Sequence, residues 1–249
     1  MEMKKITAVI GTPMGNGSHT VKLVQAFLGE VKKLDSSIES EIVTLGTMTV
    51  KPCVGCGACS RAGACVVKDD LEVIKAKLLD SDMVILGSPV YCWHVSAQYK
   101  ALIDRLWVWI HAQRLIGKPA LVVSTTAVDG MKPTLKYIRD SAFMLGLIPI
   151  GELFWAVTKA RDGINGKSIQ ASCTKIARET VRLLNGEKRV KPRIMNNFYF
   201  VGITRKAVAI PGDSWEKRFI LSKGWQKMSY RKAMDTVESQ DSCRAEADS

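Results

Sequence analysis

Four of the seven cysteines in this chain lie close together, at Cys53, Cys56, Cys59 and Cys65. Their spacing is C-x2-C-x2-C-x5-C, and glycines and alanines occupy many of the positions between them. Thiolates two residues apart on a tight turn can point at one centre, and small neighbours leave room for a compact inorganic group. Backbone N–H groups of such a loop can donate hydrogen bonds to cluster sulfides. The spacing therefore favours a [4Fe–4S] site in the loop 53–65.

Three other interpretations of these cysteines stay open. A structural zinc site usually joins two cysteine pairs that are separated by about a dozen residues or more, whereas all candidate ligands here lie in one loop. Disulfides are disfavoured because the N-terminus shows no secretory segment, and intracellular proteins keep their thiols reduced. The remaining alternative is a folded loop that binds no metal.

A polar loop, residues 11–20, follows the first predicted strand and reads G-T-P-M-G-N-G-S-H-T. It contains Gly15-x-Gly17 but has Thr20 where a dinucleotide-binding fingerprint has its third glycine. Hydroxyl and amide groups, together with the backbone N–H groups of a helix N-terminus, can bind a terminal phosphate there. The alternative is a capped helix in which Ser18 is only the N-cap residue. The candidate cofactor contacts in this loop are Thr12, Pro13, Asn16, Ser18, His19 and Thr20.

Length and composition indicate one large domain, or one ordinary domain with an extension. The chain has 249 residues, 47% of them hydrophobic, and no apolar run is long enough to cross a bilayer. The N-terminus, Met1–Lys5, leads into a strand rather than a secretory segment, so we expect a cytoplasmic protein without a membrane partner. The net charge of +12 comes without a recognised nucleic-acid motif and with only 7% aromatic residues. It therefore favours general solvation plus a docking surface, for phosphate-bearing cofactors or an acidic protein carrier, over nucleic-acid binding.

Strand and helix patterns alternate along the first 185 residues. Short apolar runs are typical of buried parallel strands, whereas apolar residues at helical spacing mark the segments between them. The predicted strands are 6–10, 39–45, 83–86, 119–125 and 147–154, and the predicted helices are 19–33, 69–79, 97–110, 133–145 and 167–184. Asp69 and Asp70 are expected to act as N-terminal charges that suit the dipole of their helix. Five strands alternating with five helices predict an α/β fold with ligands at the carboxyl ends of a parallel sheet.

Three motifs follow the third predicted strand: G-S-P-V-Y at 87–91, S-A-x-x-K at 96–100 and I-D-R at 103–105. In these motifs the chain resembles the flavodoxin-like FMN reductases. With the cysteine loop included, it resembles the iron–sulfur flavoproteins, a branch of that superfamily, over most of residues 4–185. The first loop departs from the family pattern G-S-P-R-x-N-G-x-T, because Thr12 replaces its serine and Met14 its basic residue. Phosphate binding then depends on hydroxyls and backbone N–H groups.

The resemblance implies a flavodoxin-like, doubly wound five-stranded parallel sheet in the order 2-1-3-4-5, with FMN at the ends of strands one, three and four. It also implies a [4Fe–4S] cluster held by Cys53, Cys56, Cys59 and Cys65. Further FMN contacts are expected from the third- and fourth-strand loops, at Pro89, Val90, Tyr91, Cys92, Trp93, His94, Thr125, Thr126 and Gly130. Cys92 itself is interpreted as a buried structural cysteine rather than a reactive thiol.

We expect two parts in the chain, a flavodoxin-like domain over 1–186 and a C-terminal extension over 187–249. The extension begins with a basic connector and then carries apolar residues at 198–201, Trp215, Phe219 and Trp225. Such residues are surplus to a complete sheet, so they must cover either the domain itself or a neighbouring subunit. The resemblance points to a homodimer or homotetramer.

The function that the resemblance implies is that of a flavin-dependent oxidoreductase, passing electrons between a [4Fe–4S] cluster and FMN. It implies a ferredoxin-like carrier or NAD(P)H as donor and a small molecule as acceptor, since clusters pass single electrons and flavins can pair them. Alternatives are an NAD(P)H-dependent FMN or quinone reductase with an unoccupied cysteine loop, and a redox or iron sensor. The sequence specifies neither the physiological donor nor the terminal acceptor, and it assigns no residue a catalytic role.

Overall fold

The structure is a computed structural model of the chain, and it describes residues 3–158 and 163–247. The strands are β1 (Lys5–Ile10), β2 (Glu39–Thr44), β3 (Met83–Tyr91), β4 (His94–Val95), β5 (Pro119–Thr126) and β6 (Ile148–Ala156). The α-helices are α1 (His19–Leu34), α2 (Ala58–Ala62), α3 (Leu71–Asp80), α4 (Ala97–Arg105), α5 (Trp107–His111), α6 (Met131–Met144), α7 (Lys167–Leu184), α8 (Ile194–Ala209), α9 (Trp215–Ser222) and α10 (Tyr230–Ala247). Short 3₁₀ helices are η1 (Gly15–Gly17), η2 (Gly163–Asn165) and η3 (Trp225–Lys227).

The sheet has the order β2-β1-β3-β5-β6, and each of these neighbours pairs in parallel. Because β4 is only an antiparallel addition to the end of β3, this is the predicted order 2-1-3-4-5 of the five long strands. The flavodoxin-like fold class is therefore confirmed. The sequence did not predict β4, because two residues carry too little periodicity to be recognised as a strand.

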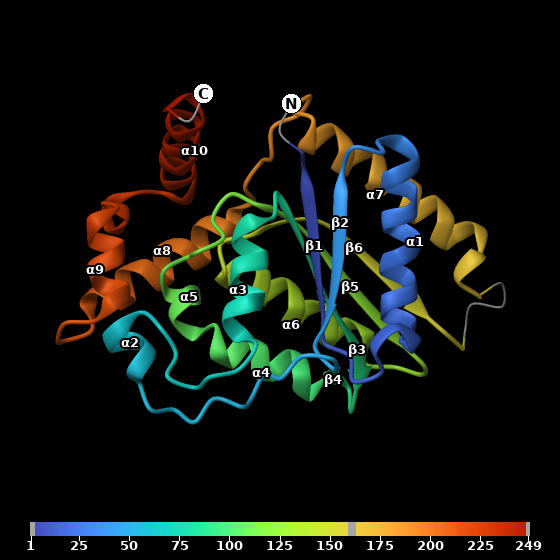
Figure 1. The fold of residues 1–249 in the computed structure, drawn as a ribbon, viewed down its shortest axis with the longest axis horizontal. Coiled ribbons are helices and arrows are strands. Elements are labelled where there is room, and N and C mark those ends of the chain that lie inside the picture. Colours follow the sequence, from blue (N-terminus) through green and yellow to red (C-terminus); the bar gives the residue numbers. More distant parts are fainter. Residues whose placement is uncertain (1–2, 159–162, 248–249) are drawn as a thin grey trace.

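Helices cover both faces of the sheet, and each face has its own core (Figure 1). Alternate residues of β1 face opposite ways: Val9 lies in the core with α3, α4 and α6, whereas Ile6, Ala8 and Ile10 lie in the core with α1 and α7. This alternation follows from the two-residue repeat of a strand. Strands buried on both faces carry continuous apolar sequence, which is why the short runs were recognisable.

The predicted helix over 97–110 is wrong in one respect, because it is two helices. The chain leaves helical geometry at Leu106, whose N–H group is shared between the carbonyls of Leu102 and Ile103. Such a shared bond is common at helix ends. The break starts α5 in a new direction and places Trp109 in the core beside α3, at 5% exposure.

The C-terminal extension packs partly on its own domain. Phe200, Trp225 and Tyr230 form a third apolar cluster with Ile116 and Ile148 of the sheet domain. The Tyr230 hydroxyl accepts a hydrogen bond from the Gly117 N–H group, at 2.9 Å. Figure 1 shows α8, α9 and α10 gathered beyond α5, on the side of the molecule away from α1 and α7.

Other apolar residues of the extension stay exposed. On α8, Ile194 is 89% exposed and Phe198 is 67% exposed. A single chain therefore covers only part of the surplus apolar surface. Whether a second subunit covers the rest, and where the domain boundary falls, stay predictions.

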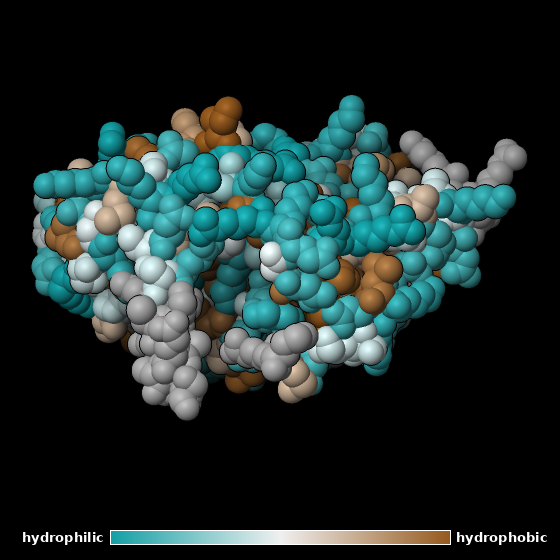
Figure 2. Space-filling view, turned by 90° about the horizontal axis from the view of Figure 1, so that it is seen from above, coloured by the Kyte–Doolittle hydropathy of each residue, from teal (hydrophilic) through white to brown (hydrophobic). Residues whose placement is uncertain are grey.

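The edge of the sheet where the strands begin is seen from above in Figure 2, and hydrophilic residues cover most of it, with hydrophobic ones scattered among them. Within residues 3–158 and 163–247, no helix combines the length and the apolar character needed to span a bilayer.

Candidate functional site

Three predicted cofactor loops meet at the carboxyl edge of the sheet. Strand pairing aligns Ile10 with Gly87 and Pro89 with Thr125, so the loops after β1, β3 and β5 emerge side by side. A hydrogen bond of 2.7 Å joins the hydroxyls of Thr20 and Thr125. The structure thus brings the three groups of candidate residues together at one edge.

The loop after β1 is held by its own hydroxyls. Thr12 Oγ1 accepts a hydrogen bond from the Met14 N–H group at 3.2 Å, and Ser18 Oγ accepts one from Thr20 N–H at 3.2 Å. Ser18 is therefore the N-cap of α1, as one interpretation held. Thr12, Ser18 and Thr20 are buried, whereas Asn16 and His19 are exposed. The buried hydroxyls shape the loop, and the N-terminus of the 16-residue α1 supplies the donors that suit a phosphate.

The turn between β3 and β4 has strained backbone. Cys92 and Trp93 both have positive φ, 46° and 65°, in a two-residue hairpin that normally selects asparagine and glycine. Such strain costs about 1–3 kcal/mol per residue and concentrates at ligand sites. Gly130 supports the hairpin, because a Cβ there would lie 2.7 Å from Val90 Cγ1 and 2.8 Å from Trp93 Cα. The hairpin and the β5–α6 loop are therefore built against each other.

Apolar side chains are left open to solvent around this edge. Trp93 is 65% exposed, Val128 74%, Met14 64% and Tyr91 42%. Apolar surface gathered on loops at the ends of parallel strands fits the planar ring system of a flavin. Cys92 is exposed as well, so its interpretation as a buried structural cysteine is wrong. Cys92 lies in the two-residue turn between β3 and β4, beyond the buried part of β3.

Some of the remaining predicted cofactor contacts are exposed, and others hydrogen-bond within their own loop. His94 is exposed and lies edge-on to Tyr137 of α6, with 4.8 Å between ring centroids. Thr126 is buried and donates to the Asp129 carbonyl at 2.6 Å. Thr126 therefore shapes the β5–α6 loop, while His94 and the half-buried Pro89 and Val90 border the edge where a cofactor would lie.

The cysteine loop leaves the same edge from β2. Cys53 and Cys56 are exposed, whereas Cys59, in the first turn of the short helix α2, and Cys65, which follows that helix, are half-buried. Gly46 joins this region to the first loop, since a Cβ there would lie 2.5 Å from the Thr12 carbonyl oxygen. Figure 1 shows the loop running along the lower edge of the molecule to α2 and returning to α3.

The four thiols fit a [4Fe–4S] cluster in number and type of donor. Burial raises the pKa of the Cys59 thiol, and charges at Cys65 and Cys53 raise it further, so these sulfurs act on one another. Across the described part of the chain, no three histidine, cysteine or acidic side chains converge as a metal site. The stretch from 51 to 57 has neither helix nor strand, which leaves Cys53 and Cys56 on irregular backbone.

An ion pair closes the base of the cysteine loop. Arg105 at the end of α4 pairs with Asp69 at 2.7 Å, and the two side chains are 1% and 0% exposed. Arg105 also donates to the carbonyls of Lys51 and Val67, at 2.7 and 3.3 Å. One guanidinium thus holds both ends of the segment that carries the four cysteines.

Asp69 accepts backbone hydrogen bonds in addition to its ion pair with Arg105. Its carboxylate accepts from the N–H groups of Lys51 and Leu71, at 2.9 and 3.2 Å. Burial alone raises the pKa of Asp69, but the Arg105 and backbone hydrogen bonds outweigh it, and the pKa lies below its usual value. Asp69 therefore serves chiefly to close the loop, and not only as a charge for the helix dipole.

The C-terminal extension holds the other side of the loop. Ser60 Oγ on α2 donates to both carboxylate oxygens of Glu216 on α9, at 2.8 and 3.1 Å, and Glu216 is only 3% exposed. His111 Nδ1 lies 3.6 Å from the same carboxylate. Burial lowers the pKa of His111, and Glu216 only partly opposes this. Ser60 is thus a closer partner of the buried Glu216 carboxylate than His111 is.

Replacing Ser60 with alanine is expected to destabilise the protein by about 1.5–3 kcal/mol, because a buried carboxylate loses a charge-assisted hydrogen bond. Urea unfolding monitored by circular dichroism measures this change. Ser172→Ala is the matched control, since Ser172 bonds within an exposed turn of α7, and its effect should stay within about 0.5 kcal/mol. Equal stabilities of the two variants would show that α9 does not hold α2 through this bond.

The sequence analysis predicted which loops would meet at this edge, but it missed the residues that brace the cysteine loop. Arg105 was visible as the last residue of the I-D-R motif, without a partner assigned to it. Ser60 and Glu216 carry no sequence signal, because they are 156 residues apart. Only the folded chain shows that the extension touches the cysteine loop.

Several known proteins share parts of this sequence and fold. The family model of NADPH-dependent FMN reductases matches residues 4–162. An iron-sulfur flavoprotein of Methanocaldococcus jannaschii is 32% identical over 151 residues, covering 59% of this chain and 76% of the relative. An iron-sulfur flavoprotein of Clostridioides difficile is 23% identical over 228 residues, covering 87% of this chain and 99% of the relative.

Among solved structures, an oxidoreductase from Corynebacterium diphtheriae has a TM-score of 0.57 with 18% identity. The match covers 75% of this chain and 100% of that one. At this identity the likeness shows the fold alone.

Proposed function

This chain belongs to the NADPH-dependent FMN reductase family, among its iron–sulfur flavoproteins, and we propose that it transfers electrons between a [4Fe–4S] cluster and FMN. Membership makes it a flavin-dependent oxidoreductase with FMN and an iron–sulfur cluster as cofactors. The observation that carries the proposal is the placement of the cysteine loop. The segment that leads from β2 to this loop starts at Gly46, which packs on the Thr12–Pro13 backbone beside the loops that would hold FMN.

Each cofactor has its own set of residues. The N-terminus of α1 with Asn16 and His19 would hold the phosphate, and Tyr91, Trp93 and Val128 would cover the flavin ring. Cys53, Cys56, Cys59 and Cys65 would hold the cluster. When bound, the cluster supplies one-electron transfer and the flavin supplies pairing of electrons for a two-electron acceptor. The chain itself would hold the two cofactors at neighbouring loops, and Arg105 would keep the two ends of the cysteine loop together.

The proposed donor is an acidic one-electron carrier of the ferredoxin kind. The net charge of +12 attracts such a carrier over a distance, and the attraction weakens as salt screens it. NADPH is the second candidate, because the matching family is described by that donor. The acceptor is proposed to be a small molecule that reaches the exposed edge near Trp93.

Anaerobically purified protein tests the proposal directly. Acid extraction should release FMN rather than FAD, since the first loop offers one phosphate site and lacks the third glycine of a dinucleotide fingerprint. Iron and acid-labile sulfide should each approach about four per chain, as a [4Fe–4S] cluster requires. FAD as the main flavin, or protein that lacks iron, would overturn it.

The same anaerobic preparation can be used to identify the electron donor. Flavin reduction by a reduced ferredoxin should be fast at low salt and slow as the salt concentration rises, because the steering is electrostatic. Reduction by NADPH at an equal rate without a carrier, and without salt dependence, would favour the NADPH-dependent reductase instead.

A further inference from the structure

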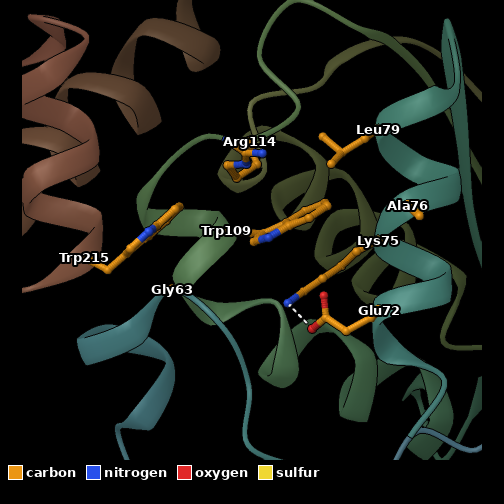
Figure 3. Close-up of a pocket in the computed structure, with 8 residues that line it drawn as sticks. All are labelled: Gly63, Glu72, Lys75, Ala76, Leu79, Trp109, Arg114 and Trp215. Atoms are coloured by element: carbon orange, nitrogen blue, oxygen red, sulfur yellow. Dashed lines mark hydrogen bonds and ion pairs between the residues drawn. The ribbon is translucent and has the colours of Figure 1, made fainter. Parts of the chain in front are cut away.

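The backbone at the end of α2 packs directly against α9 of the C-terminal extension. Gly63 ends α2 with a positive φ of 76°, and its N–H group donates to the Cys59 carbonyl at 2.7 Å. A Cβ at Gly63 would lie 2.4 Å from the Trp215 ring nitrogen, so the indole lies on bare backbone. Figure 3 shows Trp215 and Gly63 next to each other where α9 meets the end of α2. A side chain at position 63 would therefore push α9 away from the cysteine loop.

Two polar contacts join the same two elements. One is the pair of hydrogen bonds from Ser60 to the Glu216 carboxylate. In the other, Arg218 Nη2 donates to the Arg61 carbonyl at 3.1 Å. Together with the indole contact, they tie α9 to three positions of the segment 60–63, which lies between the third and fourth cysteines of the loop. The backbone between these two cysteines is therefore held by α9 as well as by its own short helix.

The half of the cysteine loop that contacts α9 is also the half that is shielded from solvent. Cys59 and Cys65 are half-buried, and with Trp215 they border the core that residues of β1, α3 and α4 form. Cys53 and Cys56, by contrast, are exposed on irregular backbone. Two of the four candidate cluster ligands thus lie on backbone that the extension holds.

The helix α9 depends on the cysteine loop in turn. Glu216 is only 3% exposed, and a carboxylate taken out of water needs hydrogen-bond donors to offset its desolvation. Ser60 supplies one from α2, at 2.8 Å. Displacing α2 would therefore remove a donor from a buried charge and uncover the Trp215 face that lies on Gly63. The docking of α9 and the shape of the cysteine loop are coupled for this reason.

We propose that Trp215, Glu216 and Arg218 are positioning residues for the iron–sulfur cluster. They hold the backbone between Cys59 and Cys65 in the conformation that binds the cluster, and so they slow its loss. Coupling between two sites is reciprocal, so a bound cluster also strengthens the docking of α9. This inference rests on the proposed function, in which the loop holds a [4Fe–4S] cluster. It assigns the extension a role beyond the part of the chain that the family model matches.

The rate of iron release tests the first half of this inference. Anaerobically purified full-length protein with both cofactors is mixed with a chromogenic iron chelator, and the absorbance of the iron complex is followed. Trp215→Ala should release iron at least about fivefold faster than wild type, the lower end of typical coupling between sites. The control is Tyr230→Phe, which removes a hydrogen bond of the extension to the Gly117 N–H group, outside the cysteine loop. Its iron release should stay within about twofold of wild type.

Hydrogen exchange tests the reciprocal half, with a result that a merely structural contact would not give. Removing iron from wild-type protein should speed amide exchange in α9 at least about fivefold. Exchange in α7, which packs in the core on the other face of the sheet, should stay unchanged. In Trp215→Ala the response of α9 to iron should shrink, because the indole no longer links the helix to the loop.

Three results would overturn the inference: equal iron release by wild type and Trp215→Ala, equal acceleration in Tyr230→Phe, or exchange in α9 that does not depend on iron. If Trp215→Ala fails to fold by circular dichroism, Arg218→Ala replaces it, with Arg205→Ala at an exposed arginine of α8 as its control. Arg218→Ala should then release iron faster than Arg205→Ala, and equal rates also overturn the inference. Protein purified without iron overturns the proposed function and this inference with it, whereas unchanged rates in iron-loaded protein overturn the inference alone.

Discussion

Replacing Arg105 with leucine is expected to destabilise the protein by about 3–5 kcal/mol, because it leaves the Asp69 carboxylate buried without its partner. Both side chains are almost fully inaccessible, and Arg105 makes bidentate contact with Asp69, at 2.7 and 3.2 Å. The same substitution removes the hydrogen bonds to the Lys51 and Val67 carbonyls. The two ends of the cysteine loop then lose their common anchor.

Urea unfolding of the variant and of wild type, prepared in the same way, measures the change. The control is Arg139→Gln, which breaks an ion pair of similar length, 2.6 Å to Glu152, at side chains that are 35% and 32% exposed. A solvent-screened pair of this kind contributes about 1 kcal/mol or less. Similar losses in the two variants would contradict a special role of the buried pair.

A double variant separates the ion pair from the packing. In Arg105→Leu with Asp69→Leu, no buried charge is left unpaired, and apolar replacements of buried pairs are often close to neutral. We therefore expect the double variant to recover part of the stability that Arg105→Leu loses. The carbonyls of Lys51 and Val67 stay without their donor in both variants, so recovery should be incomplete.

The sheet was predictable because its strands are buried on both faces. Such strands have continuous apolar sequence, and the helices between them have strong helical spacing, so α7 was predicted with the bounds that the structure shows, 167–184. The end of α4 at Leu106 was not predictable, since no proline or glycine marks it. It depends on how Trp109 fits between α3 and the extension.

The sequence predicted which loops meet at the candidate site, but it did not predict which side chains bond to one another there. Parallel strands bring their carboxyl ends to one edge, so residues after β1, β3 and β5 were expected to meet, and they do. The sequence could not show which hydroxyl groups stay free to bind a ligand. Thr20 and Thr125, for example, are 105 residues apart, and their hydroxyls bond to each other. The Arg105–Asp69 pair and the Ser60–Glu216 bond likewise join distant segments. Pairing of this kind is decided by tertiary packing, on which local sequence carries no information.

Replacing Cys59 with alanine is expected to remove iron and sulfide from the protein while FMN stays bound. Cys59 is one of four thiol ligands in the proposed site, and its side chain is half-buried at α2, on the cysteine loop. A [4Fe–4S] cluster with three thiolates loses the ligand that completes its fourth iron. The proposed flavin contacts come from the loops after β1, β3 and β5, which keep their own bonds, such as Thr20 to Thr125.

Iron, sulfide and flavin measured on the same anaerobic preparation decide the matter, with Cys92→Ala as the control. Cys92 is another free cysteine, exposed near the carboxyl edge, but it lies in the β3–β4 hairpin, so its loss should leave iron unchanged. Full iron in Cys59→Ala would remove Cys59 from the ligand set. Loss of FMN together with iron would instead mean that the cysteine loop supports the flavin site through Gly46, where it packs on the Thr12–Pro13 backbone. In that case the two cofactors would share one folding unit, and an Arg105 variant would lose flavin as well as iron.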